Sequence, residues 1–208
     1  MDPHLGIMTL LGIAASVSLL SGWRLYLCIL ATGLAMHWHV LPLPEHLQAL
    51  RVLASPWVMG AAALATLCEF FADKVPWIDS VWDMVHTAIR PIGGALLATA
   101  IVDPSDPTMQ VVAFILGGGG ALLAHSGKAG ARAVVNVSPE PFSNIALSTT
   151  EDIATSGLLY LVYAYPYVSG AVAVGLLILT GGMLFIAWRT VGRIFRRKPA
   201  SPKDAAST

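Results

Sequence analysis

Long apolar runs alternate with short polar stretches along this chain, and the pattern predicts six helices. Apolar segments of about 20 residues are what a helix needs to cross a bilayer core of roughly 30 Å. The predicted helices cover approximately residues 5–38, 56–73, 79–102, 108–136, 143–163 and 167–195. We therefore predict an all-α polytopic membrane protein in which residues 1–198 form one transmembrane domain and residues 199–208 form a disordered cytoplasmic tail.

The composition agrees with this class and excludes others. The chain of 208 residues is 56% hydrophobic and only 12% charged, with a mean hydropathy of +0.71, whereas soluble domains carry about 25% charged residues. Twelve basic residues balance twelve acidic ones, so no nucleic-acid partner is expected. The lipid bilayer is the expected partner, and the composition leaves room for a homo-oligomer.

Basic residues gather after the last predicted helix and set the expected orientation. These residues are Arg189, Arg193, Arg196, Arg197 and Lys198. Because Lys and Arg accumulate on the cytoplasmic side, six crossings would place both termini in the cytoplasm of a bacterial inner (plasma) membrane. The turns at 74–79 and 137–142 would face the cytoplasm, and those at 37–51 and 103–107 the other side.

A faint repeat relates the two halves of the chain. Ser21 and Gly22 precede Arg24 in the first helix, and Ser126 and Gly127 precede Lys128 at a similar depth in the fourth. Three helices in each half would give the two units opposite topology, as in many secondary transporters. The prediction is a 3+3 inverted repeat with broken first and fourth helices.

Four carboxylates are expected at similar depth near the cytoplasmic side. Glu69 and Asp73 lie at the end of the second helix, and Glu151 and Asp152 lie about two turns into the fifth. With a rise of about 1.5 Å per residue along each helix, both pairs lie at a similar depth in the membrane. Placing an ionisable group in a bilayer costs roughly 2.5–3.5 kcal/mol on insertion scales. We therefore expect the four acids to have a function.

Two interpretations of these acids remain open. With Asn144, Ser148 and backbone carbonyls they would suit a proton or a hard divalent cation such as Mg²⁺, Ca²⁺ or Mn²⁺. Alternatively, they pair with Lys74, Lys128 and Arg132 in a structural network. Glu69, Asp73, Glu151 and Asp152 are the predicted metal ligands under the first interpretation.

Two helical stripes supply the remaining candidates. Asp79, Asp83, His86 and Arg90 share one face of the third helix, and His125, Lys128, Arg132 and Asn136 share one face of the fourth. The second stripe would also suit a lipid phosphate. The residues assigned to a substrate or ion pathway are Arg24, Asp79, Asp83, Arg90, His125, Lys128, Arg132, Asn136, Glu140, Asn144 and Ser148.

The motifs of common enzymes do not occur. The glycine run before Lys128 lacks the spacing of a phosphate-binding loop, and Ala129 stands where that loop needs Ser or Thr. Neither a zinc-protease His-Glu-x-x-His nor a Gly-x-Ser-x-Gly elbow occurs. We therefore expect a transporter, for a divalent cation or coupled to protons, and not an enzyme. The alternatives are a lipid-phosphate binding or flipping protein that uses Lys128 and Arg132, and a scaffold that transports nothing.

Four stretches resemble a known family. They are SGWRLYL, ADKVPWIDSVWD, RPIGGALL and HSGKAGARAVVNVSPEPFSNIALSTTED, within residues 16–166. Together they are similar to a family of small bacterial multi-pass membrane proteins known as domain of unknown function 4126, which implies a membrane protein and no mechanism. A second likeness is to cation exchangers with a Glu-x-Gly-Asp-Lys motif; here Glu69, Asp73 and Lys74 are spaced one residue longer and without the glycine.

Overall fold

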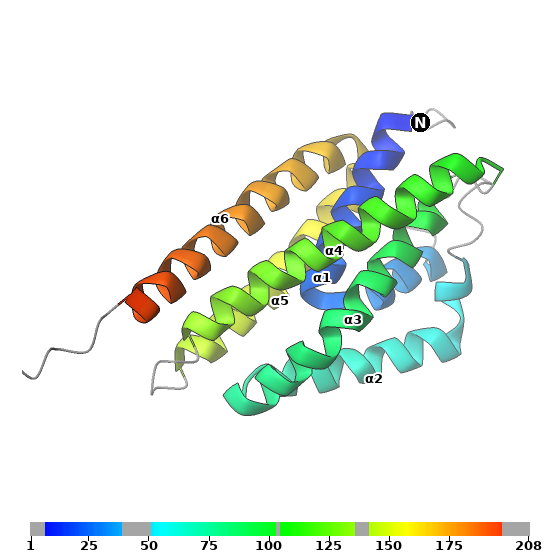
Figure 1. Ribbon diagram of the computed structural model, residues 1–208. Coiled ribbons are helices and arrows are strands. Elements are labelled where there is room, and N and C mark those ends of the chain that lie inside the picture. Colours follow the sequence, from blue (N-terminus) through cyan, green and yellow to red (C-terminus); the bar gives the residue numbers. More distant parts are fainter. Residues whose placement is uncertain (1–6, 39–50, 103–104, 136–141, 197–208) are drawn as a thin grey trace, which may run out of the picture.

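A computed structural model describes residues 7–38, 51–102, 105–135 and 142–196. Every long regular element within them is helical, which confirms the all-α prediction. The order is α1 (Ile7–His37), α2 (Pro56–Ala72), α3 (Pro76–Ile101), α4 (Pro107–Val135), α5 (Phe142–Ala164), the short 3₁₀ helix η2 (Pro166–Val168) and α6 (Ser169–Arg196) (Figure 1). The predicted tail and the candidates Asn136 and Glu140 lie outside the described residues.

Two predicted helix features are corrected. Helix α3 begins at Pro76, three residues before the predicted cap at Asp79, because proline is well suited to the first position of a helix. Asp79 therefore lies in the first turn of α3. Helix α4 runs unbroken from Pro107 to Val135, so the expected break in the fourth helix is not seen. The inverted repeat is not confirmed.

Within the described residues, four helices are long and apolar enough to cross a membrane. They are Met8–His37, Trp77–Ile101, Pro107–Val135 and Pro166–Thr190. Helix α2 is apolar but has only 17 residues, and α5 carries a polar face that contains Asn144, Ser148 and Glu151. The chain is thus a helical membrane protein, while the six-span count remains a prediction.

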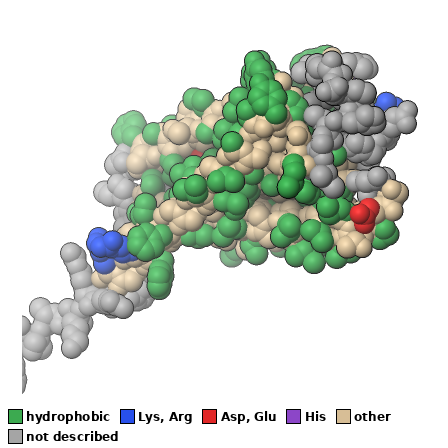
Figure 2. All heavy atoms as spheres, turned by 90° about the horizontal axis from the view of Figure 1, so that it is seen from above, with side chains coloured by type: hydrophobic (Ala, Val, Ile, Leu, Met, Phe, Trp, Pro, Cys, Tyr) green, Lys and Arg blue, Asp and Glu red, His purple; other side chains and the backbone are tan. Residues whose placement is uncertain are grey.

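Helix α1 is the centre of the bundle. It packs against each of the five other α-helices, and α2 and α6 lie on opposite sides of it (Figure 1). Its apolar side chains are buried nearly all round, among them Val17, Leu20 and Cys28, as expected for a helix with no solvent face. The outer surface is largely hydrophobic, and in Figure 2 charged side chains are visible mainly near two ends.

Glycines allow the central helices to approach closely. A Cβ atom on Gly22 of α1 would lie 2.3 Å from the carbonyl oxygen of Ala121 in α4, and one on Gly117 would lie 2.4 Å from the Cβ atom of Ala98 in α3. Small residues at such crossings bring helix backbones together in membranes. The approach of α4 to α1 and α3 carries the charged side chains of α4 into the interior.

This packing predicts different effects for two glycines in one helix. Gly117→Ala should lower the free energy of unfolding by about 1–3 kcal/mol because the added methyl overpacks the α3–α4 crossing. Gly119→Ala should be neutral or stabilising, because that position faces open space and Ala favours a helix over Gly by up to about 1 kcal/mol. Unfolding titrations in mixed micelles would measure both, and equal effects would contradict this crossing.

Candidate functional site

A cluster of charged side chains occupies the interior where α1 to α5 meet. We call it the charge cluster, and its acids are Glu69, Asp73, Asp79, Asp83, Glu151 and Asp152. Its bases are Arg24, Arg90, Lys128 and Arg132, with Lys74 at the rim. All of these except Asp152 and Lys74 are buried. Charged side chains are thus buried inside the bundle, while many large apolar side chains are exposed on its outer surface.

Helix α1 is interrupted at Arg24. The backbone there is non-helical, with φ −142° and ψ 74°, just after the Ser21-Gly22 pair that predicted a break. The carbonyl oxygens of Gly22 and Trp23 accept hydrogen bonds from Arg90 Nη1 at 3.4 Å and Lys128 Nζ at 3.2 Å. Bases from α3 and α4 therefore stabilise the interruption, since broken helices need partners for their freed backbone groups.

Asp73 receives three cations on one carboxylate oxygen. Its Oδ2 atom pairs with Arg24 Nη1, with Lys128 Nζ at 3.3 Å and with Arg132 Nη2 at 3.2 Å. Its carbonyl oxygen also accepts hydrogen bonds from Arg132 Nη1 at 3.1 Å and Asn144 Nδ2 at 2.9 Å. Asp73 is the C-terminal cap of α2, so the end of that helix is fixed to α1, α4 and α5.

Glu151 binds the same three bases from the side of α5. Its Oε2 atom lies 2.7 Å from Arg132 Nη2, 3.4 Å from Arg24 Nη2 and 3.6 Å from Lys128 Nζ. The neighbouring Asp152 pairs with Arg24 Nε at 2.9 Å. Arg24 Nη2 also donates to the Ser148 carbonyl at 3.1 Å. The mid-helix arginine thus has three carboxylate partners.

Glu69 belongs to a second part of the charge cluster. Its Oε1 atom accepts from Arg90 Nη2 at 2.6 Å, and Arg90 Nη1 pairs with Asp83 Oδ1 at 3.2 Å and donates to His125 Nδ1 at 2.6 Å. Asp79 is joined to the first part through Arg132 Nη1 at 2.6 Å. The four predicted metal ligands are therefore divided, with Glu69 on Arg90 and the other three on Arg24.

The described residues show no group of three or more His, Cys, Asp or Glu side chains arranged to hold a metal ion. The carboxylates are instead separated by guanidinium and ammonium groups. The acids do meet the bases Lys128 and Arg132, as the structural interpretation predicts, while the binding of a proton or cation stays a prediction. Lys74 does not join the ion pairs of the cluster; its ammonium donates to the Phe70 carbonyl at 3.2 Å and lies over the Phe70 ring.

Several carboxylate oxygens remain without hydrogen-bond partners in the described part of the chain. They are Glu69 Oε2, Asp73 Oδ1, Glu151 Oε1 and Asp152 Oδ2. Each of these acids thus uses one oxygen for the bases and leaves the other unsatisfied. Buried polar atoms are nearly always paired, so these oxygens point to a proton, a water or a ligand.

The hydroxyl groups of Tyr26 and Thr87 contact the histidines of the two predicted stripes, and neither residue was identified from the sequence. His86 stacks on Trp82 with ring centroids 4.5 Å apart and shares a hydrogen bond of 3.0 Å with the Tyr26 hydroxyl. Thr87 shares a hydrogen bond of 3.1 Å with His125 Nε2. In the turn between α2 and α3, partial burial lowers the pKa of Lys74, against the opposing effect of the Asp152 carboxylate. Only the helical spacing of His86 and Arg90 had indicated this face.

Comparison with known proteins identifies the family. The family model described as "Domain of unknown function (DUF4126)" matches residues 11–186, and this agrees with the resemblance seen in the sequence motifs. No curated protein and no solved structure matched the chain. What the cluster does must therefore be inferred from its geometry.

The position of Asp73 predicts a large effect on stability. Asp73→Asn should lower the free energy of unfolding by about 3–5 kcal/mol, because it leaves three buried bases short of a counter-charge. Asp106→Asn is the matched control; Asp106 is exposed and caps α4 through Met109 N–H, a role that Asn also fills. Equal unfolding midpoints for the two variants would contradict the central place of Asp73.

Proposed function

The chain belongs to the DUF4126 family of unknown function, and we propose that it is a proton-coupled membrane transporter for a monovalent cation. Its site would be the charge cluster, opening toward the cytoplasm of a bacterial inner membrane, with both termini on that side. The unsatisfied carboxylate oxygens carry this proposal. Ionisable side chains inside membrane bundles commonly mark ion pathways and proton relays.

Proton exchange is supported by the presence of carboxylates and a lysine beside the arginines of the charge cluster. Guanidinium groups keep their protons in proteins, whereas carboxylates and lysine can exchange them. Asp73, Glu151 and Lys128 meet around Arg24 and Arg132, so a proton arriving at a carboxylate would weaken its ion pairs. The freed base could then pair with another acid, which would alter how α1, α4 and α5 are held together.

The interrupted α1 supports transport as well. Discontinuous helices commonly form the substrate and ion sites of secondary transporters. Here the interruption at Arg24 lies within the charge cluster, and its carbonyl oxygens are bound by the bases Arg90 and Lys128. A change in those ion pairs would therefore act directly on the backbone of the central helix.

The charge balance favours a monovalent over a divalent ion. Among the described residues of the charge cluster, six carboxylates face four buried bases and Lys74 at the rim, whose ammonium donates to Ser148 and pairs with none of the acids. With the acids ionised, the histidines neutral and Lys74 charged, one negative charge remains. One proton or one monovalent cation would neutralise it, whereas a divalent cation would leave an excess of positive charge in a medium that strongly disfavours it.

The other predicted functions have less support. A lipid phosphate would have to displace Asp73 or Glu151 from Lys128 and Arg132, because both bases are already paired with these acids. A purely structural scaffold would keep its ion pairs unchanged, whereas the carboxylates and Lys128 of the charge cluster can exchange protons.

Proteoliposomes loaded with a pH-sensitive dye would test transport. Dilution into Na⁺, K⁺ or ethanolamine chloride should change the internal pH in response to at least one of these cations. The double variant Glu69→Gln, Glu151→Gln should reduce the rate at least tenfold, because the amides cannot carry the proton. Glu69→Asp, Glu151→Asp keeps the charges and should retain part of the rate.

Size-exclusion profiles and helix content of the reconstituted variants would show that they are folded, and Asp106→Asn should match the wild-type rate. The proposal is wrong if the wild type responds to none of the three cations, or if the double amide variant transports at the wild-type rate.

Divalent cations provide a separate test. Added Mg²⁺, Ca²⁺ or Mn²⁺ should leave the melting temperature of the purified protein unchanged, because bases already occupy the space between the acids. A ligand that binds only the folded state must raise that temperature. A rise that disappears in Asp152→Asn would instead support the predicted divalent site.

A further inference from the structure

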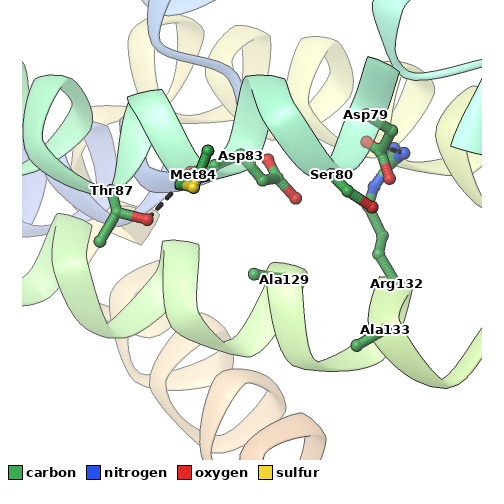
Figure 3. Close-up of a pocket in the computed structure, with 8 residues that line it drawn as sticks. All are labelled: Asp79, Ser80, Asp83, Met84, Thr87, Ala129, Arg132 and Ala133. Atoms are coloured by element: carbon green, nitrogen blue, oxygen red, sulfur yellow. Dashed lines mark hydrogen bonds and ion pairs between the residues drawn. The ribbon is translucent and has the colours of Figure 1, made fainter. Parts of the chain in front are cut away.

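A groove of about 410 Å³ lies between α3 and α4 and reaches the charge cluster from the side. It separates the N-terminal half of α3 from the C-terminal half of α4 (Figure 3). Its lining residues are Asp79, Ser80, Asp83, Met84, Thr87, Ala129, Arg132 and Ala133. The proposed function uses the ion pairs behind this groove and assigns no role to the groove itself.

The groove is open because small side chains on α4 lie opposite polar side chains on α3 and do not fill the space between the two helices. Ala129 and Ala133 are four residues apart on α4, and Asp79 and Asp83 are four apart on α3, so each pair lies on one helix face. Figure 3 shows Arg132 reaching across to Asp79 at one end of the groove. A larger side chain at Ala129 would fill the space without altering any charge.

Asp83 presents an unused hydrogen-bond acceptor to this groove. Its relative exposure is only 7%, and its Oδ1 atom pairs with Arg90 Nη1 at 3.2 Å. In the described residues, Oδ2 has neither a hydrogen-bond nor an ion-pair partner. Figure 3 shows the carboxylate pointing into the space between the two helices. The second oxygen of this mostly buried carboxylate therefore faces the groove and is available to a donor.

We propose that this groove binds a small organic ammonium compound. The inference rests on the proposed function only in taking that compound as the transported cation. The remaining negative charge of the cluster calls for one positive charge, and the Asp83 carboxylate is an acceptor for N–H donors. Ligand pockets for small molecules measure about 300–1,000 Å³, so a volume of 410 Å³ exceeds what a bare inorganic ion needs.

The rest of the lining fits the carbon skeleton of an amine. Met84 and the methyl groups of Ala129 and Ala133 are apolar, and Thr87 adds a hydroxyl beside Asp83. The outer edge of α3 carries the exposed apolar side chains Val81 and Val85, so the groove opens beside a lipid-facing surface. The ammonium group could belong to a free amine or to the headgroup of phosphatidylethanolamine.

Calorimetric titration of the purified full chain would test for the free amine. Ethanolamine should bind the wild type, while ethylene glycol, which has the same size without the charge, should not. Ala129→Leu should weaken ethanolamine binding at least tenfold by filling the groove, and Asp83→Asn should do so by removing the charge. Ala146→Leu, on an exposed position of α5, and Asp106→Asn should bind as the wild type does.

A second experiment distinguishes a free amine from the headgroup of phosphatidylethanolamine as the source of the ammonium group. Native mass spectrometry after reconstitution into nanodiscs would compare phosphatidylethanolamine with phosphatidylglycerol. Retention of phosphatidylethanolamine by the wild type but not by Ala129→Leu would identify the lipid headgroup as the ligand, and binding of ethanolamine alone would identify a free amine. The groove site is overturned if neither binds, or if Ala129→Leu binds either one as tightly as the wild type.

The outcomes also distinguish this site from the transport proposal. Ethanolamine binding that Ala129→Leu removes, together with no cation-dependent pH change in proteoliposomes, would keep the groove site and refute transport. A pH change driven by Na⁺ or K⁺, together with no binding of ethanolamine or phosphatidylethanolamine, would keep transport and refute the groove site.

Discussion

The structure depends on the neutralisation of Asp73 inside an apolar bundle. A carboxylate at this depth is tolerated only with opposite charges beside it, and Arg24, Lys128 and Arg132 supply them from α1 and α4. The same bases bind Glu151 on α5. One acid at the end of α2 therefore joins four helices, α1, α2, α4 and α5.

The interruption of α1 and the charge cluster support each other. An unbroken helix at Arg24 would keep the carbonyl groups of Gly22 and Trp23 in its own hydrogen bonds, and Arg90 and Lys128 would lose these acceptors. Conversely, an interruption without those bases would leave carbonyl groups unpaired in a medium that offers no water. The central helix and the cluster thus form one unit. A change in the charge of the cluster would also change the hydrogen bonds that stabilise the interrupted backbone of α1.

The acids of the charge cluster differ in whether they line the groove. The acids around Asp73 share the bases Arg24, Lys128 and Arg132, whereas Asp79 and Asp83 line the groove between α3 and α4. Arg132 binds Asp73 and Glu151 on one side and Asp79 on the other, and Arg90 joins Asp83 to Glu69. A ligand in the groove would therefore act on the inner acids through these two guanidinium groups.

The sequence by itself determined the helical class, the membrane setting and the identity of the buried charged residues. Long apolar runs and helical spacing are local properties of the sequence. Because an unpaired charge in a bilayer is costly, a charged residue within an apolar run, such as Arg24, can be recognised as buried and paired before its partner is known. Only the tertiary structure decided the partners. The sequence grouped Glu69 with Asp73, but Glu69 binds Arg90, and the repeat predicted a break in α4 where the helix is continuous. The groove likewise depends on alanines of α4 meeting acids of α3. Pairing and cavities are set by which faces of distant helices come together, and spacing within one helix carries no information about the helix opposite.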